Sequence, residues 1–328
     1  MMRELLEVLT SKVGISGSEH GISEYVAGEL RESGADVSVD RMGNVRAFLD
    51  KGVDKTVCFE AHIDEIGLIV KRVCDGGFLK FASIGGVNPQ TLPASEVVVH
   101  ARGGDRIGVI TSVPPHLQKG EAKKAVKLED LYIDIGGDSE GISIGDRVSF
   151  RGRAGEMIGG RFVSKAIDNR MGVAVLMELA KRIKGRELDR NVMFLMTVQE
   201  EVGCRGAEMV RLGDEIESVV VIDVTHAISA VVSEDEGYPI DKIAVGVGPG
   251  LDRGISDRLM ELAGEDGVVE VCAGNSGTTA WNFQVKNGGV PTGLVSAPIR
   301  YMHTASEFID LGTCEKLVAI LARFVLNE

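Results

Sequence analysis

Two different periods of apolar residues run through this chain of 328 residues. Near the start, Ile22, Val26 and Leu30 recur every four positions, with Tyr25 on the same side. Gly34 follows the last of them, and glycine is a common residue at the end of a helix. The spacing therefore predicts an amphipathic helix that ends near this glycine.

A strand is predicted at residues 56–70, where apolar and polar positions alternate. One face would carry apolar side chains, namely Val57, Phe59, Ala61 and Ile63. The opposite face would carry Cys58, Glu60, His62 and Asp64. Three ionisable side chains would therefore share one face of a largely buried strand.

After residue 163 the pattern alternates between helices and strands. Helices are predicted at 169–184, at 254–263 and at the C-terminus, and strands at 191–198 and 217–223. The C-terminal helix has an apolar stripe of Leu317, Ile320, Leu321 and Phe324. Strands that alternate with helices need crossover connections, which predicts an α/β fold with a mixed, mostly parallel sheet sandwiched by helices.

The segment from about residue 70 to residue 161 has a different texture, with short β-type runs broken by Gly- and Pro-rich turns. This pattern predicts a small β-barrel or PDZ-like domain inserted into the larger one. The chain would then consist of a discontinuous α/β domain at 1–69 and 162–328 and an inserted β-domain at 70–161.

Composition and charge exclude several classes of protein. Hydrophobic residues make up 44% and charged residues 26%, as in globular proteins. No apolar run approaches the roughly 20 residues that cross a bilayer, and the N-terminus lacks the layout of a secretion signal, so we expect a soluble, cytoplasmic protein. The five scattered cysteines form no CxxC pair, and a net charge of −13 argues against nucleic acid or an anionic membrane as partner.

Polar side chains gather where the predicted strands end or helices begin. In open α/β sheets the ligand crevice lies outside the carboxyl ends of the strands, so these side chains are expected to converge. The set comprises His62, Asp64, Asp168, Glu200, Glu201, Asp223 and His303. Carboxylates held close together without a cation repel one another, and a divalent metal removes the repulsion. Imidazole and carboxylate suit zinc, cobalt or manganese, and five ligands exceed what one catalytic zinc takes, which favours two ions.

Simpler interpretations exist for each residue taken alone. A strand histidine is more often half-buried and structural, and His20, His100, His116 and His226 are assigned no function. Asp168 can cap the following helix, and the pair Glu200 and Glu201 can form an exposed corner. Spacing alone does not decide which of these two glutamates binds metal.

Five motifs in order resemble one known family. They are "EAHIDEIGLIV", "KAIDNRMGVAVL", "QEEVGCRGA", "VIDVTHA" and "RYMHTASE", with "KLEDLYIDIGG" in the inserted segment. Together they are similar to the dinuclear metallo-aminopeptidases that include the TET-type and glutamyl aminopeptidases, over essentially the whole chain. The resemblance implies a zinc-exopeptidase-like fold and two divalent ions per subunit, zinc or cobalt foremost and manganese as a third candidate.

The resemblance also assigns a role to each residue. It implies that His62 and Asp223 each bind one metal terminally, that Asp168 bridges the two ions, and that Glu201 and His303 complete the set of ligands around the second ion. Asp64 would orient His62, and Glu200 would be the general base that takes a proton from a water bridging the metals. The peptide bond after the first residue of a short peptide would then be hydrolysed.

The same resemblance implies that the inserted domain mediates self-assembly, with relatives forming a tetrahedral dodecamer. One stretch departs from the family: "NSGTTAWNF" places Thr279 where relatives commonly have aspartate, so the preferred N-terminal residue does not carry over. Cys204 beside the glutamates is expected to be a buried thiol. Competing functions are a dinuclear deacylase or carboxypeptidase, a glucanase as described for some relatives, and a catalytically silent metal-binding or assembly protein.

Overall fold

The computed structural model describes residues 1–117, 125–274 and 277–326. Its largest element is an eight-stranded sheet with the order β1-β2-β12-β3-β13-β16-β14-β15. These strands are, in that order, Asp36–Val39, Val45–Leu49, Asn191–Thr197, Thr56–His62, Ile216–His226, Thr292–Ile299, Ile243–Val247 and Gly267–Val271. Four neighbouring pairs are parallel and three are antiparallel, so the sheet is mixed.

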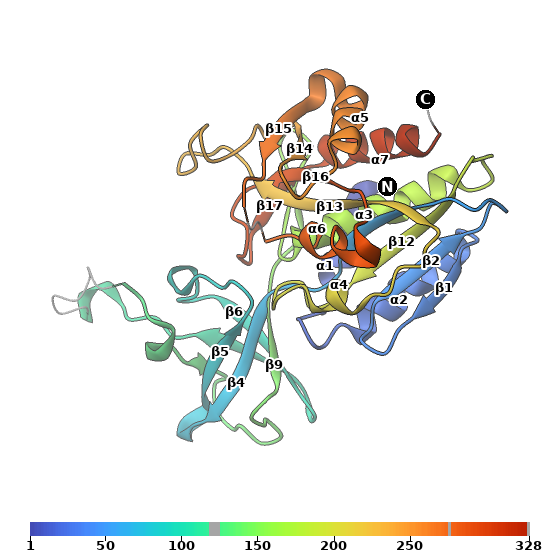
Figure 1. Cartoon of the computed structure of the whole chain (residues 1–328). Coiled ribbons are helices and arrows are strands. Elements are labelled where there is room, and N and C mark those ends of the chain that lie inside the picture. The colour runs from blue at the N-terminus through green and yellow to red at the C-terminus, as the bar shows by residue number, and fades with distance from the viewer. Residues whose placement is uncertain (118–124, 275–276, 327–328) are drawn as a thin grey trace.

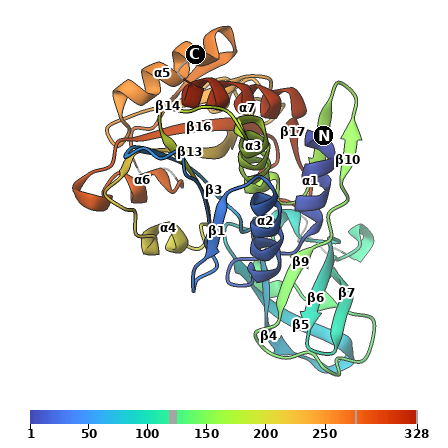
Figure 2. The ribbon, with the colours of Figure 1, turned by 90° about the vertical axis from the view of Figure 1, so that its right-hand side faces the viewer.

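Helices cover both faces of this sheet (Figure 2). On one face lie α1 (Met2–Ser11), α2 (His20–Glu32), α3 (Ile167–Ile183), α5 (Arg253–Ala263) and α7 (Leu311–Leu326). On the other lie the short helices α4 (Arg205–Met209) and α6 (Ala280–Phe283). Because both faces are covered, every residue of β3 and of β12 is buried. This burial explains the continuous apolar run of β12.

A closed barrel forms a second body beside the sheet (Figure 1). Its strands are β4 (Gly67–Val73), β5 (Phe78–Ile84), β6 (Glu96–Ala101), β7 (Gly104–Ile110), β8 (Ile133–Asp134) and β9 (Arg147–Phe150). A separate apolar cluster fills it. The hairpin of β10 (Gly155–Met157) and β11 (Arg161–Ser164) pairs with β17 (Glu307–Asp310) instead of joining the barrel.

Most predicted elements are present, with ends that differ by a few residues. The helices expected at 20–34, 169–184 and 254–263 are α2, α3 and α5, and the strands expected at 191–198 and 217–223 are β12 and β13. Short 3-10 turns lie at Asp75–Gly77, Pro89–Thr91, Pro115–Leu117, Leu128–Asp130, Gly264–Asp266 and Lys286–Gly288. None of the described helices is long and apolar enough to cross a bilayer.

The prediction of one strand at 56–70 is wrong. β3 ends at His62 in the large sheet, and β4 begins at Gly67 in the barrel. Between them the chain turns so that Glu65 is buried, where it accepts a hydrogen bond from the Gly14 amide and pairs with Lys165. In the sequence, apolar and polar positions keep alternating through this turn. The polar side chains there point into the protein, where they form ionic contacts with distant parts of the chain.

Candidate metal centre

The seven predicted site residues lie together at one edge of the large sheet. His62 ends β3, Asp223 lies near the end of β13, and Glu200 and Glu201 lie in the turn just past the end of β12. Asp168 lies in the first turn of α3, and His303 follows β16. Except for Asp64, these residues line one cavity of about 800 Å³. The convergence expected at the carboxyl ends of parallel strands is therefore present.

The two histidines approach opposite oxygens of the same carboxylate. His62 Nε2 is 3.1 Å from Asp168 Oδ1. His303 Nε2 is 3.3 Å from Asp168 Oδ2 and 3.3 Å from Glu201 Oε2. On the other side, His62 Nε2 is 3.9 Å from Asp223 Oδ1. Asp168 therefore lies between a His62–Asp223 pair and a His303–Glu201 pair.

These side chains form two groups with the spacing of metal ligands. In each group the ligand atoms of three residues lie within 4.8 Å of one another: His62, Asp168 and Asp223 in the first, and Asp168, Glu201 and His303 in the second. Each group offers one imidazole nitrogen and carboxylate oxygens, a donor set that suits divalent zinc, cobalt or manganese. The donor chemistry and the shared Asp168 fit a pair of divalent ions.

The pKa values in the cluster reflect the repulsion between buried carboxylates that a bound cation relieves. Burial raises the pKa of Glu200 to about 7, and it raises the pKa of Asp223 well above its usual value. Burial alone would lower the pKa of His303, but the carboxylates of Asp168 and Glu201 raise it to about 11. The protonated imidazoles supply the positive charge among several buried carboxylates.

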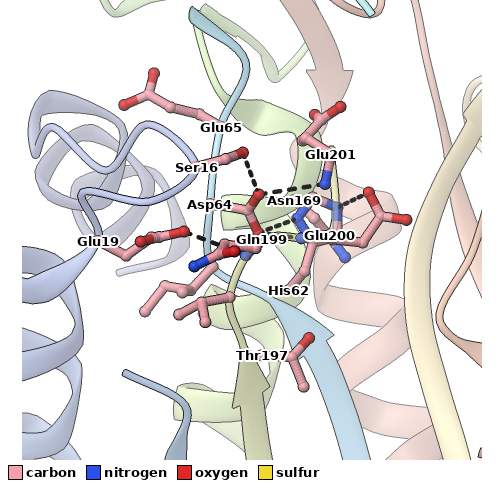
Figure 3. A network of polar contacts seen from close by, with 12 residues as sticks. Ser16, Glu19, His62, Asp64, Glu65, Asn169, Thr197, Gln199, Glu200 and Glu201 are labelled. Carbon is pink, nitrogen blue, oxygen red and sulfur yellow. Dashed lines mark hydrogen bonds and ion pairs between the residues drawn. The ribbon is translucent and has the colours of Figure 1, made fainter. Parts of the chain in front are cut away.

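Asp64 faces His62, as expected, but the contact is an ionic one and not a hydrogen bond. The distance from His62 Nδ1 to Asp64 Oδ1 is 3.5 Å, and Nδ1 has no hydrogen-bond partner among the described residues. The Asp64 carboxylate instead accepts from the backbone N–H groups of Glu200 at 3.0 Å and Glu201 at 3.3 Å, and from the Ser16 hydroxyl at 2.6 Å (Figure 3). Asp64 therefore positions the main chain that carries both glutamates.

Glu307 is a site residue that the sequence reasoning missed. Its carboxylate accepts from the backbone N–H of Asp168 at 3.0 Å and from that of His303 at 2.8 Å. Burial raises the pKa of Glu307 to about 8. It lies four residues after His303 in the "HTASE" motif, and this proximity was the one available signal.

The barrel also contributes to the centre, which was not predicted. The carbonyl of Gly86, in the segment after β5, lies 2.9 Å from His303 Nδ1. A carbonyl oxygen can only accept, so Nδ1 carries a proton here, and Nε2 is the nitrogen that faces Asp168. A Cβ on Gly86 would lie 2.7 Å from His303 Nδ1, so only glycine permits this approach.

Thr279 is buried and hydrogen-bonds another buried side chain. Its hydroxyl donates to Glu60 Oε2 at 2.5 Å, and Thr197 donates to Glu60 Oε1 at 2.5 Å. The neighbouring Thr278 lines the cavity, whereas Asn275 and Ser276 of the same stretch lie outside the described residues. The bond from Thr279 thus ties the segment that carries Thr278 to Glu60 of β3, whose side chain points to the same face of that strand as His62.

Two other residues differ in part from expectation. Cys204 is half-buried, with its Sγ 3.3 Å from Glu200 Oε1, and burial raises the pKa of its thiol. The thiol form predominates at neutral pH, in keeping with the expectation of an ordinary thiol. His226, which was assigned no function, lines the cavity.

The chain is similar to known proteins over nearly its whole length. Residues 43–320 match the model of the M42 glutamyl aminopeptidase family. The chain is 31% identical to the lysyl aminopeptidase of Pyrococcus furiosus, over 99% of this chain and 96% of that protein. Among solved structures it resembles an aminopeptidase of Desulfurococcus kamchatkensis, with a TM-score of 0.91 at 31% identity, covering 100% of this chain and 95% of that one.

Two further solved structures bear on the competing functions. The TET1 peptidase of Pyrococcus horikoshii, which can assemble into a tetrahedron or a large octahedral shell, matches with a TM-score of 0.87 at 29% identity over all of both chains. A structure described as an endoglucanase of Thermotoga maritima matches with a TM-score of 0.75 at 26% identity, over 98% of this chain and 96% of that one. The family match and the aminopeptidase relatives support peptide hydrolysis and imply divalent metal ions. On these matches, the chain belongs to the M42 glutamyl aminopeptidase family of metal-dependent aminopeptidases.

Proposed function

We propose that this chain removes N-terminal residues from short peptides by means of two divalent ions, with Glu200 as the general base. The observation that carries the proposal is the shared carboxylate: both histidine Nε2 atoms face separate oxygens of Asp168. His62, Asp168 and Asp223 would hold one ion, and Asp168, Glu201 and His303 the other. The donor set favours zinc or cobalt, with manganese as a further candidate.

Glu200 is the side chain best placed to move protons. It lies outside both ligand groups, although its Oε2 is only 4.0 Å from His62 Nε2 and it lines the cavity. Bound divalent ions would lower the pKa of a water between them and polarise the peptide carbonyl. The Glu200 carboxylate accepts the proton of that water during attack and delivers it to the leaving nitrogen. Glu201, one residue later, is left for metal binding.

The substrate would be held with its free amino group at the centre. A free α-amino group would bind one of the ions as a ligand or donate a hydrogen bond to a carboxylate of the centre, which favours cleavage after the first residue. A cavity of about 800 Å³ accommodates a short peptide. The same ligands serve a deacylase or a carboxypeptidase, and cleavage of free but not N-acylated peptides separates the aminopeptidase from both.

We also propose that the chain forms a homo-oligomer through its barrel, and that residues 70–161 act as the assembly domain. The TET1 relative assembles into a tetrahedron or an octahedral shell, and this chain matches it over its full length. A tetrahedral dodecamer is the form we favour. Light scattering on the purified chain tests this assignment, and a monomer would overturn it.

The proposed activity is tested by removing metal with a chelator and adding back zinc, cobalt or manganese. Hydrolysis of aminoacyl chromogenic substrates should disappear and return with at least one metal. N-acylated substrates and β-glucan oligosaccharides should not be cleaved. No turnover of aminoacyl substrates with any metal would overturn the proposal, and cleavage of glucan alone would favour the glucanase alternative.

A further inference from the structure

The cavity extends beyond the metal centre to a wall built from the end of the large sheet. This wall includes Thr225 of β13, Glu270 of β15 and Ser296 of β16. Thr225 follows Asp223 by two residues on the same strand, so the two side chains share a face and lie about 7 Å apart. Whatever binds at Asp223 therefore has the wall within reach of a long side chain.

Glu270 places a carboxylate in this wall with one oxygen unused. Its Oε1 accepts a hydrogen bond from the Thr225 hydroxyl at 2.7 Å. Its Oε2 is buried and has no hydrogen-bond partner among the described residues. A buried acceptor left without a donor is costly, and the cost is larger for a charged group. The stability of the fold does not account for a buried oxygen that is left without a hydrogen bond.

The surroundings of Glu270 supply little compensating charge. Burial raises the pKa of its carboxyl, while the nearby side chains of Thr225, Ser296 and His226 favour the ionised form. Within the described ranges no lysine or arginine forms an ion pair with it. The carboxylate thus lies in a cavity wall with the Thr225 hydroxyl as its hydrogen-bond donor and with no cationic partner among the described residues.

We propose that Glu270 is a specificity-determining residue that selects peptides with a cationic first side chain, lysine or arginine. This inference rests on the proposed aminopeptidase function. With the α-amino group and first carbonyl at the metal centre, a long side chain runs along the wall past Thr225. Its ammonium or guanidinium group pairs with the carboxylate of Glu270, whose partly exposed side chain lines the cavity, in a charge-assisted hydrogen bond. A neutral side chain leaves the carboxylate without a cationic partner, and an acidic one meets its negative charge.

The test compares kcat/KM for lysyl, arginyl, leucyl and glutamyl chromogenic substrates in the metal-loaded enzyme. The wild type should prefer the lysyl and arginyl substrates. Glu270→Gln should lower kcat/KM for these two about 10- to 100-fold while leaving the leucyl substrate within about threefold, since one charged hydrogen bond is lost. Glu270→Lys should raise the relative rate on the glutamyl substrate.

The matched control is Glu265→Gln, which makes the same chemical change at an exposed position before β15. It should leave all four rates unchanged. A wild type that prefers leucyl or glutamyl substrates, or a Glu270→Gln variant that loses activity equally on all four, would overturn the subsite while leaving the proposed function intact. Absence of turnover on every substrate would instead overturn the proposed function and the subsite with it.

Discussion

The carboxylate of Asp64 receives the backbone N–H of Glu200 in a hydrogen bond of 3.0 Å. This bond ties the turn after β3 to the turn after β12, and both turns carry residues of the candidate metal centre. The base proposed for the reaction is therefore positioned through its main chain, by a side chain that lies outside both proposed ligand groups.

Replacing Asp64 by asparagine tests this positioning role. The amide oxygen can accept one of the two backbone N–H groups, while the amide nitrogen opposes the other. We expect metal affinity and kcat to fall about 10- to 100-fold, the usual cost of losing a group that orients metal ligands. Metal titration and steady-state kinetics measure both. Ser16→Ala is the control, because it removes one donor to Asp64 and keeps both backbone bonds, and an equal loss in the two variants would contradict the prediction.

Glu200→Gln and Glu201→Gln should separate proton transfer from metal binding. Glu200→Gln should keep both ions and lose about 10²- to 10⁴-fold in kcat, because the amide cannot accept the proton. Glu201→Gln should lose affinity at the site that it shares with His303. Metal content by elemental analysis and kcat decide between them. Near-normal turnover of Glu200→Gln with both ions bound would show that the base lies elsewhere.

Gly86→Ala should disturb the centre from the barrel side. The added Cβ would lie 2.7 Å from His303 Nδ1, so the imidazole must move away. We expect the affinity for one of the two ions to fall about tenfold or more. The control is Gly28→Ala in α2, where nothing lies within 4 Å of the new Cβ and the helix should gain about 0.5–1 kcal/mol. Unchanged metal affinity in Gly86→Ala would show that the barrel does not contribute to the metal centre.

Glu19→Gln should change the pH dependence of stability. Glu19 accepts from the backbone N–H groups of Gly17 and Gln199, and burial raises its pKa from 4.5 to about 7. Below about pH 4.5 both states are protonated. As pH rises toward 7 the unfolded chain releases this proton while the folded chain retains it, so the wild type loses stability relative to the variant.

The expected difference in unfolding free energy grows between pH 4.5 and 7 to about 1–2 kcal/mol and then stays constant. Urea denaturation at several pH values measures it. Glu32→Gln at the exposed end of α2 provides the control and should show no such trend. A pH-independent difference between Glu19→Gln and the wild type would mean that the Glu19 carboxyl is not perturbed.

The sequence predicted those parts of the fold that depend on local patterns. Helix periodicity located α2, α3 and α5, and the ends of apolar strands located His62, Asp223 and the two glutamates. It did not predict β14 and β15, because short runs such as "GVVEV" (267–271) carry too little periodicity to be distinguished from loops. Of the two, β15 carries Glu270 into the cavity wall.

Contacts between distant segments were the other part that the sequence could not supply. Glu307 reaches the amide of Asp168, which is 139 positions away, and Gly86 reaches His303 across 217 positions. Nothing in the local sequence distinguishes such residues from an ordinary acidic loop residue or a turn glycine. The prediction of one strand at 56–70 was wrong for the same reason. The strand ends at His62 because the side chains of the following turn pair with distant residues, which the local sequence does not show.

The carbonyl of Gly86 links two bodies that otherwise have separate apolar cores. A displacement of the segment that carries Gly86 would therefore be felt at the His303 imidazole. If the barrel makes the proposed contacts between subunits, assembly and the position of His303 would be coupled through this carbonyl. For the same reason, deleting the barrel would leave the sheet packed but would remove the carbonyl that holds the His303 imidazole.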